Sequence, residues 1–137
     1  MGVERYLITS AVNGVLAQRL VRTLCGHCKE AYEPGVAVRQ STGLSRFCPT
    51  DQLVYRAVGC EHCRQSGYRG RTGIHELLAL DEPMRRAIIE GRDANTLNAI
   101  AAQAGMLSLH EDGLRKVAAG VTTLDELARV TQDQSDA

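Results

Sequence analysis

Two pairs of cysteines, each with two residues between its members, are the residues of this chain best suited to chemistry. They are Cys25 and Cys28 in Cys-Gly-His-Cys, and Cys60 and Cys63 in Cys-Glu-His-Cys. Four thiolates from two such pairs suit one tetrahedral Zn²⁺, with Zn–S distances of about 2.3 Å. Because all four ligands would come from the protein, no position is left for water or substrate, and we predict a structural rather than a catalytic zinc.

Other uses of paired cysteines fit the sequence less well. Nothing at the N-terminus resembles a secretory signal, so we expect a reducing cytosol rather than disulfides. Haem attachment needs a His directly after the second Cys, where Lys29 and Arg64 stand instead. A dithiol oxidoreductase using Cys25 and Cys28 stays open, since a Cys-x-x-Cys turn can lower a thiol pKa. That alternative leaves the second cysteine pair unexplained.

The residues around the cysteine pairs support less specific predictions. His27 and His62 could replace a cysteine as ligand, but we expect them to donate to carbonyls or to face water. Cys48 is expected to be a partly buried free thiol. Four thiolates around Zn²⁺ leave a net negative charge, so we expect donors close by. The candidates are Arg22, Lys29, Arg64 and Arg69.

Composition limits the kind of core that this chain can form. The 137 residues are 44% hydrophobic but include one Phe, four Tyr and no Trp, so a bound metal would help a core with little bulk. Net charge is zero, yet residues 1–80 carry ten basic and six acidic side chains, and residues 81–137 carry six and ten. This asymmetry is too mild to predict a nucleic-acid partner. No apolar run approaches the roughly 18 residues that span a bilayer.

The elements that position the cysteines predict an α+β fold. We expect an N-terminal helix, a small tetracysteine subdomain with a β-hairpin, and a small C-terminal helical bundle. The boundaries are placed at residues 1–24, 25–80 and 81–131, with a frayed polar tail at 132–137.

The N-terminal helix is predicted over residues 11–24. Thr9 or Ser10 would cap it, and Leu7 with Ile8 would form a short strand or a hydrophobic staple before it. We expect an exposed apolar face on this helix, and hence some self-association.

The tetracysteine subdomain contains several short elements. Residues 36–41 predict a short helix, and residues 53–58 a strand that leads to Cys60. Gly59 is expected to let the backbone approach the second pair closely. Residues 67–73 predict a glycine-rich turn, and Ile74 to Leu80 a strand. No Gly-x-x-x-x-Gly-Lys-Ser/Thr phosphate loop occurs in the sequence.

Four helices are predicted in the C-terminal bundle. Asp81 and Asp93 are the expected N-caps of the first two. The third begins at residue 108 or 109 and ends at Gly120. Thr123 and Glu126 form a predicted capping box at the start of the fourth, with no catalytic meaning.

The order of these features resembles a known family. Residues 13–22 (Asn-Gly-Val-Leu-Ala-Gln-Arg-Leu-Val-Arg), followed by Leu24, Cys25 and Cys28, look like the region after the motor core in type II secretion ATPases. Residues 67–78 (Gly-Tyr-Arg-Gly-Arg-Thr-Gly-Ile-His-Glu-Leu-Leu) match the stretch after that family's second cysteine pair. The type IV pilus assembly ATPases share this layout. Further matches in the C-terminal helical region are Met106, Gly113, Lys116, Gly120, Thr122, Thr123 and Glu126.

The resemblance implies a part of a larger machine. In that family a hexameric ring uses ATP to drive pseudopilus growth at the inner membrane. The four cysteines match the family's zinc ligands, whereas its phosphate-binding lysine, metal-holding acidic residues and essential histidines have no counterparts here. We therefore expect the C-terminal portion of such a motor, which does not hydrolyse ATP alone; ATP and Mg²⁺ belong to the full-length protein.

The implied role is that of a zinc-stiffened arm. Its expected partners are the N-terminal ATPase core, neighbouring subunits of the ring and inner-membrane platform proteins, in a cytoplasmic setting peripheral to the bacterial inner membrane. Two alternatives stay open. One is a zinc-ribbon nucleic-acid module using Tyr68 with Arg64, Arg69 and Arg71, and the other is the dithiol oxidoreductase.

Overall fold

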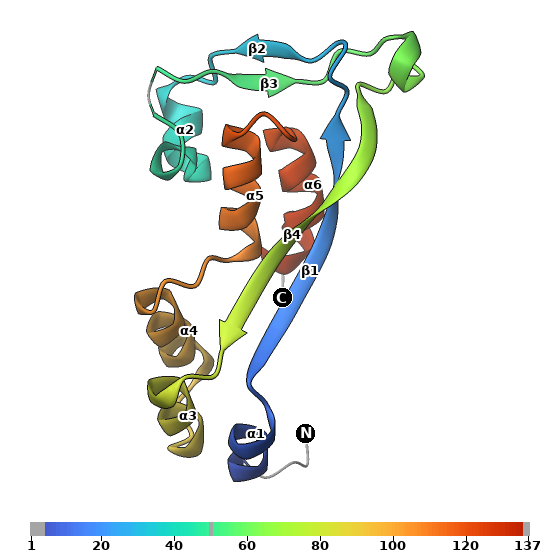
Figure 1. Cartoon of the computed structure of the whole chain (residues 1–137). Coiled ribbons are helices and arrows are strands. Elements are labelled where there is room, and N and C mark those ends of the chain that lie inside the picture. The colour runs from blue at the N-terminus through green and yellow to red at the C-terminus, as the bar shows by residue number, and fades with distance from the viewer. Residues whose placement is uncertain (1–4, 50, 136–137) are drawn as a thin grey trace. The chain divides into compact units, whose positions relative to one another are not determined.

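The computed structural model describes residues 5–49 and 51–135, in two compact units. Unit 1 contains the described residues up to Ala17 together with His75–Ser108, and unit 2 contains Gln18–Ile74 and the described residues from Leu109 onward. Helices and antiparallel strands are both present, which confirms the predicted α+β class. In chain order the elements of Figure 1 are α1 (Arg5–Ala11), β1 (Gly14–Leu24), β2 (Glu30–Tyr32), α2 (Val36–Thr42), the 3₁₀ helix η1 (Leu44–Arg46), β3 (Val54–Arg56), the 3₁₀ helix η2 (Glu61–Cys63), β4 (Tyr68–Ala79), α3 (Glu82–Ile89), α4 (Ala94–Gln103), α5 (Leu109–Ala118) and α6 (Leu124–Ser135).

The predicted helix over residues 11–24 is wrong. Helix α1 ends at Ala11, and the chain continues as strand β1, so the predicted strand at Leu7 and Ile8 is wrong as well. Apolar spacing suggested a helix, but hydrogen-bonded pairing with β4, far along the chain, decides the conformation. Within β1 only Val21 and Leu24 are buried, so its apolar residues do not form one covered stripe.

The predicted turn over residues 67–73 is also wrong, whereas the predicted strand after it is confirmed. Strand β4 begins at Tyr68 and continues without interruption to Ala79, antiparallel to β1 in Figure 1. Gly70 takes a positive φ of 83° inside this strand, a conformation open to glycine because it lacks Cβ. Gly70 therefore lies within a continuous strand and does not reverse the chain.

Unit 1 contains a small apolar core formed largely by two helices. Leu80, Met84 and Ala101 are buried at its centre. The partly buried side chains packed against them are Val12, Leu78, Ile88, Leu97, Ile100 and Met106. Both predicted N-caps are confirmed, since Asp81 accepts from the Met84 N–H at 3.0 Å and Asp93 from the Thr96 N–H at 2.8 Å.

Unit 2 contains the cysteines, a short sheet and the last two helices. Strands β2 and β3 pair antiparallel with Ala31 opposite Tyr55; β3 falls within the predicted strand, and β2 was not predicted. The short helix α2 is confirmed and ends at Gly43 in the left-handed conformation. Helices α5 and α6 lie side by side in Figure 1, and a Cβ at Gly113 would lie 2.2 Å from a Leu127 methyl carbon. Gly113 thus allows the two helices their close approach.

The compact units do not follow the predicted segment boundaries. All four predicted C-terminal helices exist, but α3 and α4 belong to unit 1, and α5 and α6 to unit 2. Helix α6 runs through Ser135, into the predicted tail, of which residues 136 and 137 lie outside the described residues. Among the described residues, no helix has both the length and the apolar character needed to cross a membrane.

Candidate metal centre

Four cysteine sulfurs from two distant parts of the chain meet in unit 2. The Sγ atoms of Cys25, Cys28, Cys60 and Cys63 all lie within 4.8 Å of one another. Three Sγ–Sγ distances are 3.8 Å, and two of these, Cys25–Cys60 and Cys28–Cys63, join one pair to the other. All four thiols are free of disulfides. The chain therefore brings all four predicted ligands together as one group able to hold a single metal ion.

Each cysteine pair lies where a regular element begins or ends. Cys25 directly follows β1, and a backbone bond of 3.1 Å from the Lys29 N–H to the Cys25 carbonyl closes the first turn. Cys60 precedes η2 and Cys63 ends it. A 2.9 Å bond from the Cys25 N–H to the Gly67 carbonyl links the two pairs through the backbone.

Backbone N–H groups point at the sulfurs. Gly59 donates to the Cys28 Sγ at 3.3 Å, Cys60 to the Cys63 Sγ at 3.2 Å, and Gly67 also to the Cys63 Sγ at 3.1 Å. Such donors favour the thiolate, which is the form that binds metal. Burial by itself raises the pKa of Cys63, but these two N–H groups and the neighbouring thiols lower that pKa to about 6. Burial raises the pKa of Cys60 to about 11, so in the metal-free site the two thiols differ.

The second cysteine pair depends on two glycines with positive φ. A Cβ on Gly59 would lie 2.8 Å from the Gln65 carbonyl oxygen, and one on Gly67 would lie 2.5 Å from the Ala57 Cβ. The predicted close approach at Gly59 is therefore confirmed. Arg64 and Gln65 also adopt the left-handed conformation, with φ of 54° and 65°, which is uncommon outside glycine. In this backbone conformation the N–H groups of Gly59, Cys60 and Gly67 point toward cysteine sulfurs.

Among the described residues, none of the four predicted basic side chains donates a hydrogen bond to a cysteine sulfur. Arg22 binds Glu126, and the Lys29 Nζ donates to the Gly120 carbonyl at 3.0 Å, while neither Arg64 nor Arg69 donates to a sulfur. Backbone N–H groups, which sequence patterns do not reveal, are the donors to sulfur instead.

The other predicted neighbours of the site lie beside it rather than in it. The rings of His27 and His62, one from each pair, stack with centroids 3.9 Å apart and an interplanar angle of 17°, and both residues are exposed. Cys48 is a free thiol as predicted, but fully buried, and accepts a 3.4 Å hydrogen bond from the buried Arg39 guanidinium. Neither histidine nor Cys48 belongs to the four-sulfur group.

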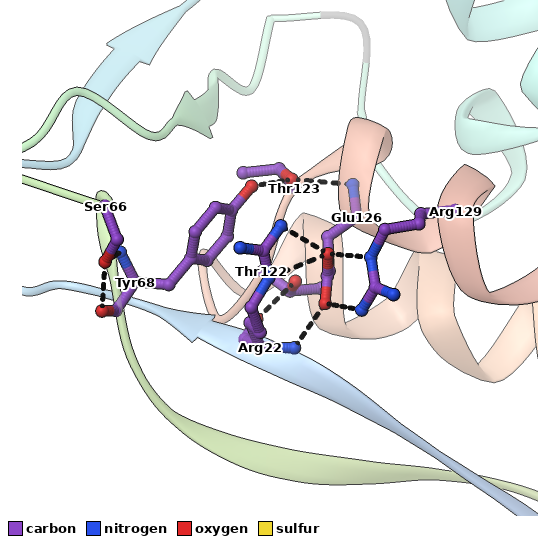
Figure 2. A network of polar contacts seen from close by, with 7 residues as sticks. All are labelled: Arg22, Ser66, Tyr68, Thr122, Thr123, Glu126 and Arg129. Atoms are coloured by element: carbon purple, nitrogen blue, oxygen red, sulfur yellow. Dashed lines mark hydrogen bonds and ion pairs between the residues drawn. The ribbon is translucent and has the colours of Figure 1, made fainter.

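One important residue was missed by the sequence analysis. Glu126 was predicted as half of a capping box, and its own N–H does donate to the Thr123 hydroxyl at 2.9 Å. Its carboxylate, however, is bound by the guanidinium groups of Arg22 and Arg129 (Figure 2). Burial alone would raise the pKa of Glu126, but these guanidinium groups and the Arg22 N–H lower it to about 2. No local signal could have revealed this, because Arg22 lies 104 positions away.

Comparison with known proteins identifies the family that this chain resembles in sequence. The family model described as type II/IV secretion system protein matches residues 1–129. The type II secretion system protein HxcR of Pseudomonas aeruginosa is 47% identical over 97% of this chain, and the type II secretion system protein E of Dickeya dadantii is 46% identical over 98% of it. The type IV pilus assembly ATPase PilB of Thermus thermophilus is 45% identical over 96% of the chain. These matches cover 24%, 26% and 15% of the respective relatives, so the chain spans about a quarter of their length or less.

Proposed function

The chain belongs to the family of type II/IV secretion system proteins, and from this premise we propose that it is the C-terminal portion of a secretion motor ATPase, stiffened by one structural zinc ion. The observation that carries the zinc proposal is the meeting of four sulfurs within 4.8 Å of one another. Four thiolates in this arrangement favour Zn²⁺ among the common biological metals.

The chemistry that zinc supplies here is cross-linking. Cys25, Cys28, Cys60 and Cys63 would fill the coordination sphere, which leaves no open position for a substrate. The three N–H···S hydrogen bonds support this assignment, because they offset thiolate charge without needing a cation. The free energy of metal binding then becomes folding free energy of unit 2.

The motor activity itself belongs to the full-length protein. We propose that ATP and Mg²⁺ bind in the remaining three quarters or so of such a protein and that this segment hydrolyses nothing alone. It would act as a passive arm that passes movement to a neighbouring ring subunit or to inner-membrane platform proteins. We therefore propose a cytoplasmic location for the protein, peripheral to the inner membrane.

Exposed apolar residues on β1 and β4 support a contact with the rest of the protein. Val15, Leu16 and Leu20 of β1 are 53%, 59% and 47% exposed, and Leu77 of β4 is 57% exposed. Isolated apolar side chains on a surface are ordinary, but several along two paired strands fit a surface covered in a larger protein. Without that cover we expect self-association, which light scattering across a concentration series measures; Leu16→Lys with Leu77→Lys should suppress it.

The test of the zinc proposal is metal content together with thermal melting. We expect about one zinc per purified chain, and a large loss of melting temperature when a chelator removes it. Cys63→Ser should lose the metal, whereas Cys48→Ser, a matched change at a cysteine outside the group, should retain it. A metal-free wild-type chain with an unchanged melting temperature would overturn the proposal.

The same measurements separate the alternatives. A dithiol oxidoreductase needs Cys25 and Cys28 reactive as a pair, yet two of the three closest sulfur contacts join different pairs. Metal-bound thiolates should resist alkylation until chelator is added. A nucleic-acid module would stack a base on Tyr68, but the Arg22 guanidinium lies 4.2 Å from that ring's centroid and the hydroxyl contacts Thr123. A salt-dependent shift with mixed oligonucleotides would favour that alternative.

A further inference from the structure

Residues 22–24, which lead directly into Cys25, are held by the segment that starts α6. The Leu24 N–H donates to the Val121 carbonyl at 2.8 Å. The Thr122 hydroxyl donates to the Arg22 carbonyl at 2.8 Å, and the Arg22 N–H donates to a carboxylate oxygen of Glu126 at 2.7 Å. A loop carbonyl, a hydroxyl and a carboxylate thus provide the backbone hydrogen bonds that a neighbouring strand would otherwise supply.

Side chains reinforce this attachment (Figure 2). The Glu126 side chain is fully buried and accepts from the Arg22 Nε and Nη2 at 3.1 and 3.0 Å, and from the Arg129 Nε and Nη2 at 2.9 and 2.8 Å. The two arginine side chains are 45% and 59% exposed, so the carboxylate is the buried member of the network.

The network also reaches the second cysteine pair. The Tyr68 ring lies under the Arg22 guanidinium, and the Tyr68 hydroxyl is 2.8 Å from the Thr123 hydroxyl oxygen. Tyr68 follows Gly67, whose N–H donates to the Cys63 sulfur and whose carbonyl accepts from the Cys25 N–H. The start of α6 therefore contacts the residues next to both halves of the four-sulfur group.

We propose that Glu126 is a positioning residue for the metal centre. Its carboxylate fixes residues 22–24, and through them the position of Cys25 relative to Cys60 and Cys63, so that retention of the metal depends on α6. This inference rests on the metal binding proposed above and adds a residue outside the cysteine pairs that controls it.

A role in positioning the chain explains the burial of the Glu126 carboxylate better than a contribution to stability alone does. Desolvating a charge is costly, and a well-packed apolar side chain often stabilises a core as well as a buried ion pair does. An apolar residue at position 126 could not accept the Arg22 N–H and would leave it without a partner. What the carboxylate provides is a fixed location for one backbone N–H, three residues before the first metal ligand.

The experiment measures zinc release from the zinc-loaded full chain into an excess of a chromogenic chelator, at 25 °C and neutral pH. Glu126→Gln should release zinc about tenfold faster than wild type, at the lower end of the effect of losing a partner around a metal site. Thr122→Val, which removes only the bond to the Arg22 carbonyl, should accelerate release about threefold. If Glu126→Gln fails to fold, Thr122→Val carries the test.

Two control variants separate positioning from general destabilisation. Arg46→Ala removes an ion pair with Glu111 that lies in the same unit but outside the Glu126 network, so release should stay within about twofold of wild type. Leu44→Ala truncates a fully buried side chain of the same unit outside the network; it should lower the melting temperature without matching the faster release. As a separate readout, binding of Co²⁺, followed by its visible absorption, should weaken about tenfold in Glu126→Gln.

Each outcome decides a different point. Normal zinc loading with unchanged release and Co²⁺ affinity in Glu126→Gln and Thr122→Val would overturn the positioning role and leave the proposed function intact. Equal acceleration in Arg46→Ala or Leu44→Ala would reduce Glu126 to an ordinary stabilising residue. A wild-type chain that binds neither metal would overturn the zinc proposal and this inference together.

Discussion

The two compact units reach stability by different means. Unit 1 has a core centred on three buried residues, Leu80, Met84 and Ala101, and its helices α3 and α4 begin with aspartate caps. Among the described residues, unit 2 buries more aliphatic side chains, including Leu44, Leu114 and Leu127, and it buries four polar or charged residues where unit 1 buries Thr9. The polar and charged residues are Arg39, Thr122, Thr123 and Glu126.

The difference shows how a chain poor in aromatic residues can be held together. In unit 1 short-range signals act within a few residues of one another, as in the caps at Asp81 and Asp93. In unit 2 the decisive contacts join distant parts of the chain, since the sulfur contacts span 35 positions and the Arg22–Glu126 contact spans 104. We expect unit 2 to respond to changes in metal and charge, and unit 1 to respond to changes in apolar packing.

Metal removal should give the largest effect and should be confined to unit 2. With chelator, we expect amide protons of α5 and α6 to lose most of their protection against exchange, because the proposed metal binding would contribute its free energy to the folding of unit 2. Amide protons of α3 should change little. Hydrogen exchange measured by mass spectrometry checks this, and equal loss of protection in both units would contradict the division.

Met84→Ala should give the opposite pattern. Met84 is 1% exposed at the centre of the unit 1 core, and truncation of such a side chain costs about 2–5 kcal/mol. We expect exchange protection to fall in α3 and α4 while zinc content stays unchanged. Ile89→Ala, at a residue 53% exposed in the same helix, serves as the control with little effect. Loss of zinc from Met84→Ala would mean that the units fold as one.

The effect of Glu126→Gln on unfolding free energy, measured against pH, tests how much charge contributes to the stability of unit 2. The pKa of Glu126 falls from 4.5 to about 2 in the folded state, so the ionised carboxylate contributes about 3 kcal/mol more to stability than the protonated carboxyl would. Because the folded-state pKa is lowered, this contribution is present in full above about pH 4.5 and is lost as the pH falls toward 2.

We therefore expect a constant difference in unfolding free energy between wild type and Glu126→Gln from pH 7.5 to 5.5, measured by urea denaturation. Below about pH 4.5 the difference should shrink. If the difference in unfolding free energy already disappeared between pH 7 and 6, the pKa of Glu126 would be far above the value of about 2. Glu111→Gln, at an ion pair with Arg46 in the same unit, is the matched control.

Loss of a helix cap should give the smallest effect. Asp81→Ala removes the acceptor for the Met84 N–H at the start of α3 and should cost about 1 kcal/mol. Asp81→Asn, which keeps an acceptor oxygen, should cost less. The melting of unit 1 checks this expectation, and a loss as large as that of Met84→Ala would contradict the ranking.

Local signals explain how much could be predicted. The capped helices α3 and α4, the short helix α2 and the part of β4 from Ile74 onward all follow from residues within a few positions of one another. The grouping of the four cysteines could be predicted because two Cys-x-x-Cys pairs are typical of cysteines that bind one metal ion together. These regions needed no knowledge of distant contacts.

Non-local pairing explains what could not be predicted. Residues 14–24 have helical apolar spacing but form β1, because β4 offers backbone partners that spacing does not reveal. Glu126 matched a capping pattern, and only the folded chain shows that its carboxylate binds Arg22 and Arg129. The N–H donors to sulfur depend on left-handed residues such as Arg64, for which the sequence carries no recognisable pattern.

The 104-position separation between Arg22 and Glu126 has a consequence for biogenesis. A ribosome makes residues from the N-terminus onward at roughly 5–20 per second, so both cysteine pairs emerge several seconds before α6. During that interval the thiols can collect an ion, but the strand leading to Cys25 has no carboxylate to hold it. Helix α6 is translated after β1 and completes its hydrogen bonds, so if the chain binds zinc as proposed, a nascent chain stalled before position 126 should exchange that zinc faster than the full chain.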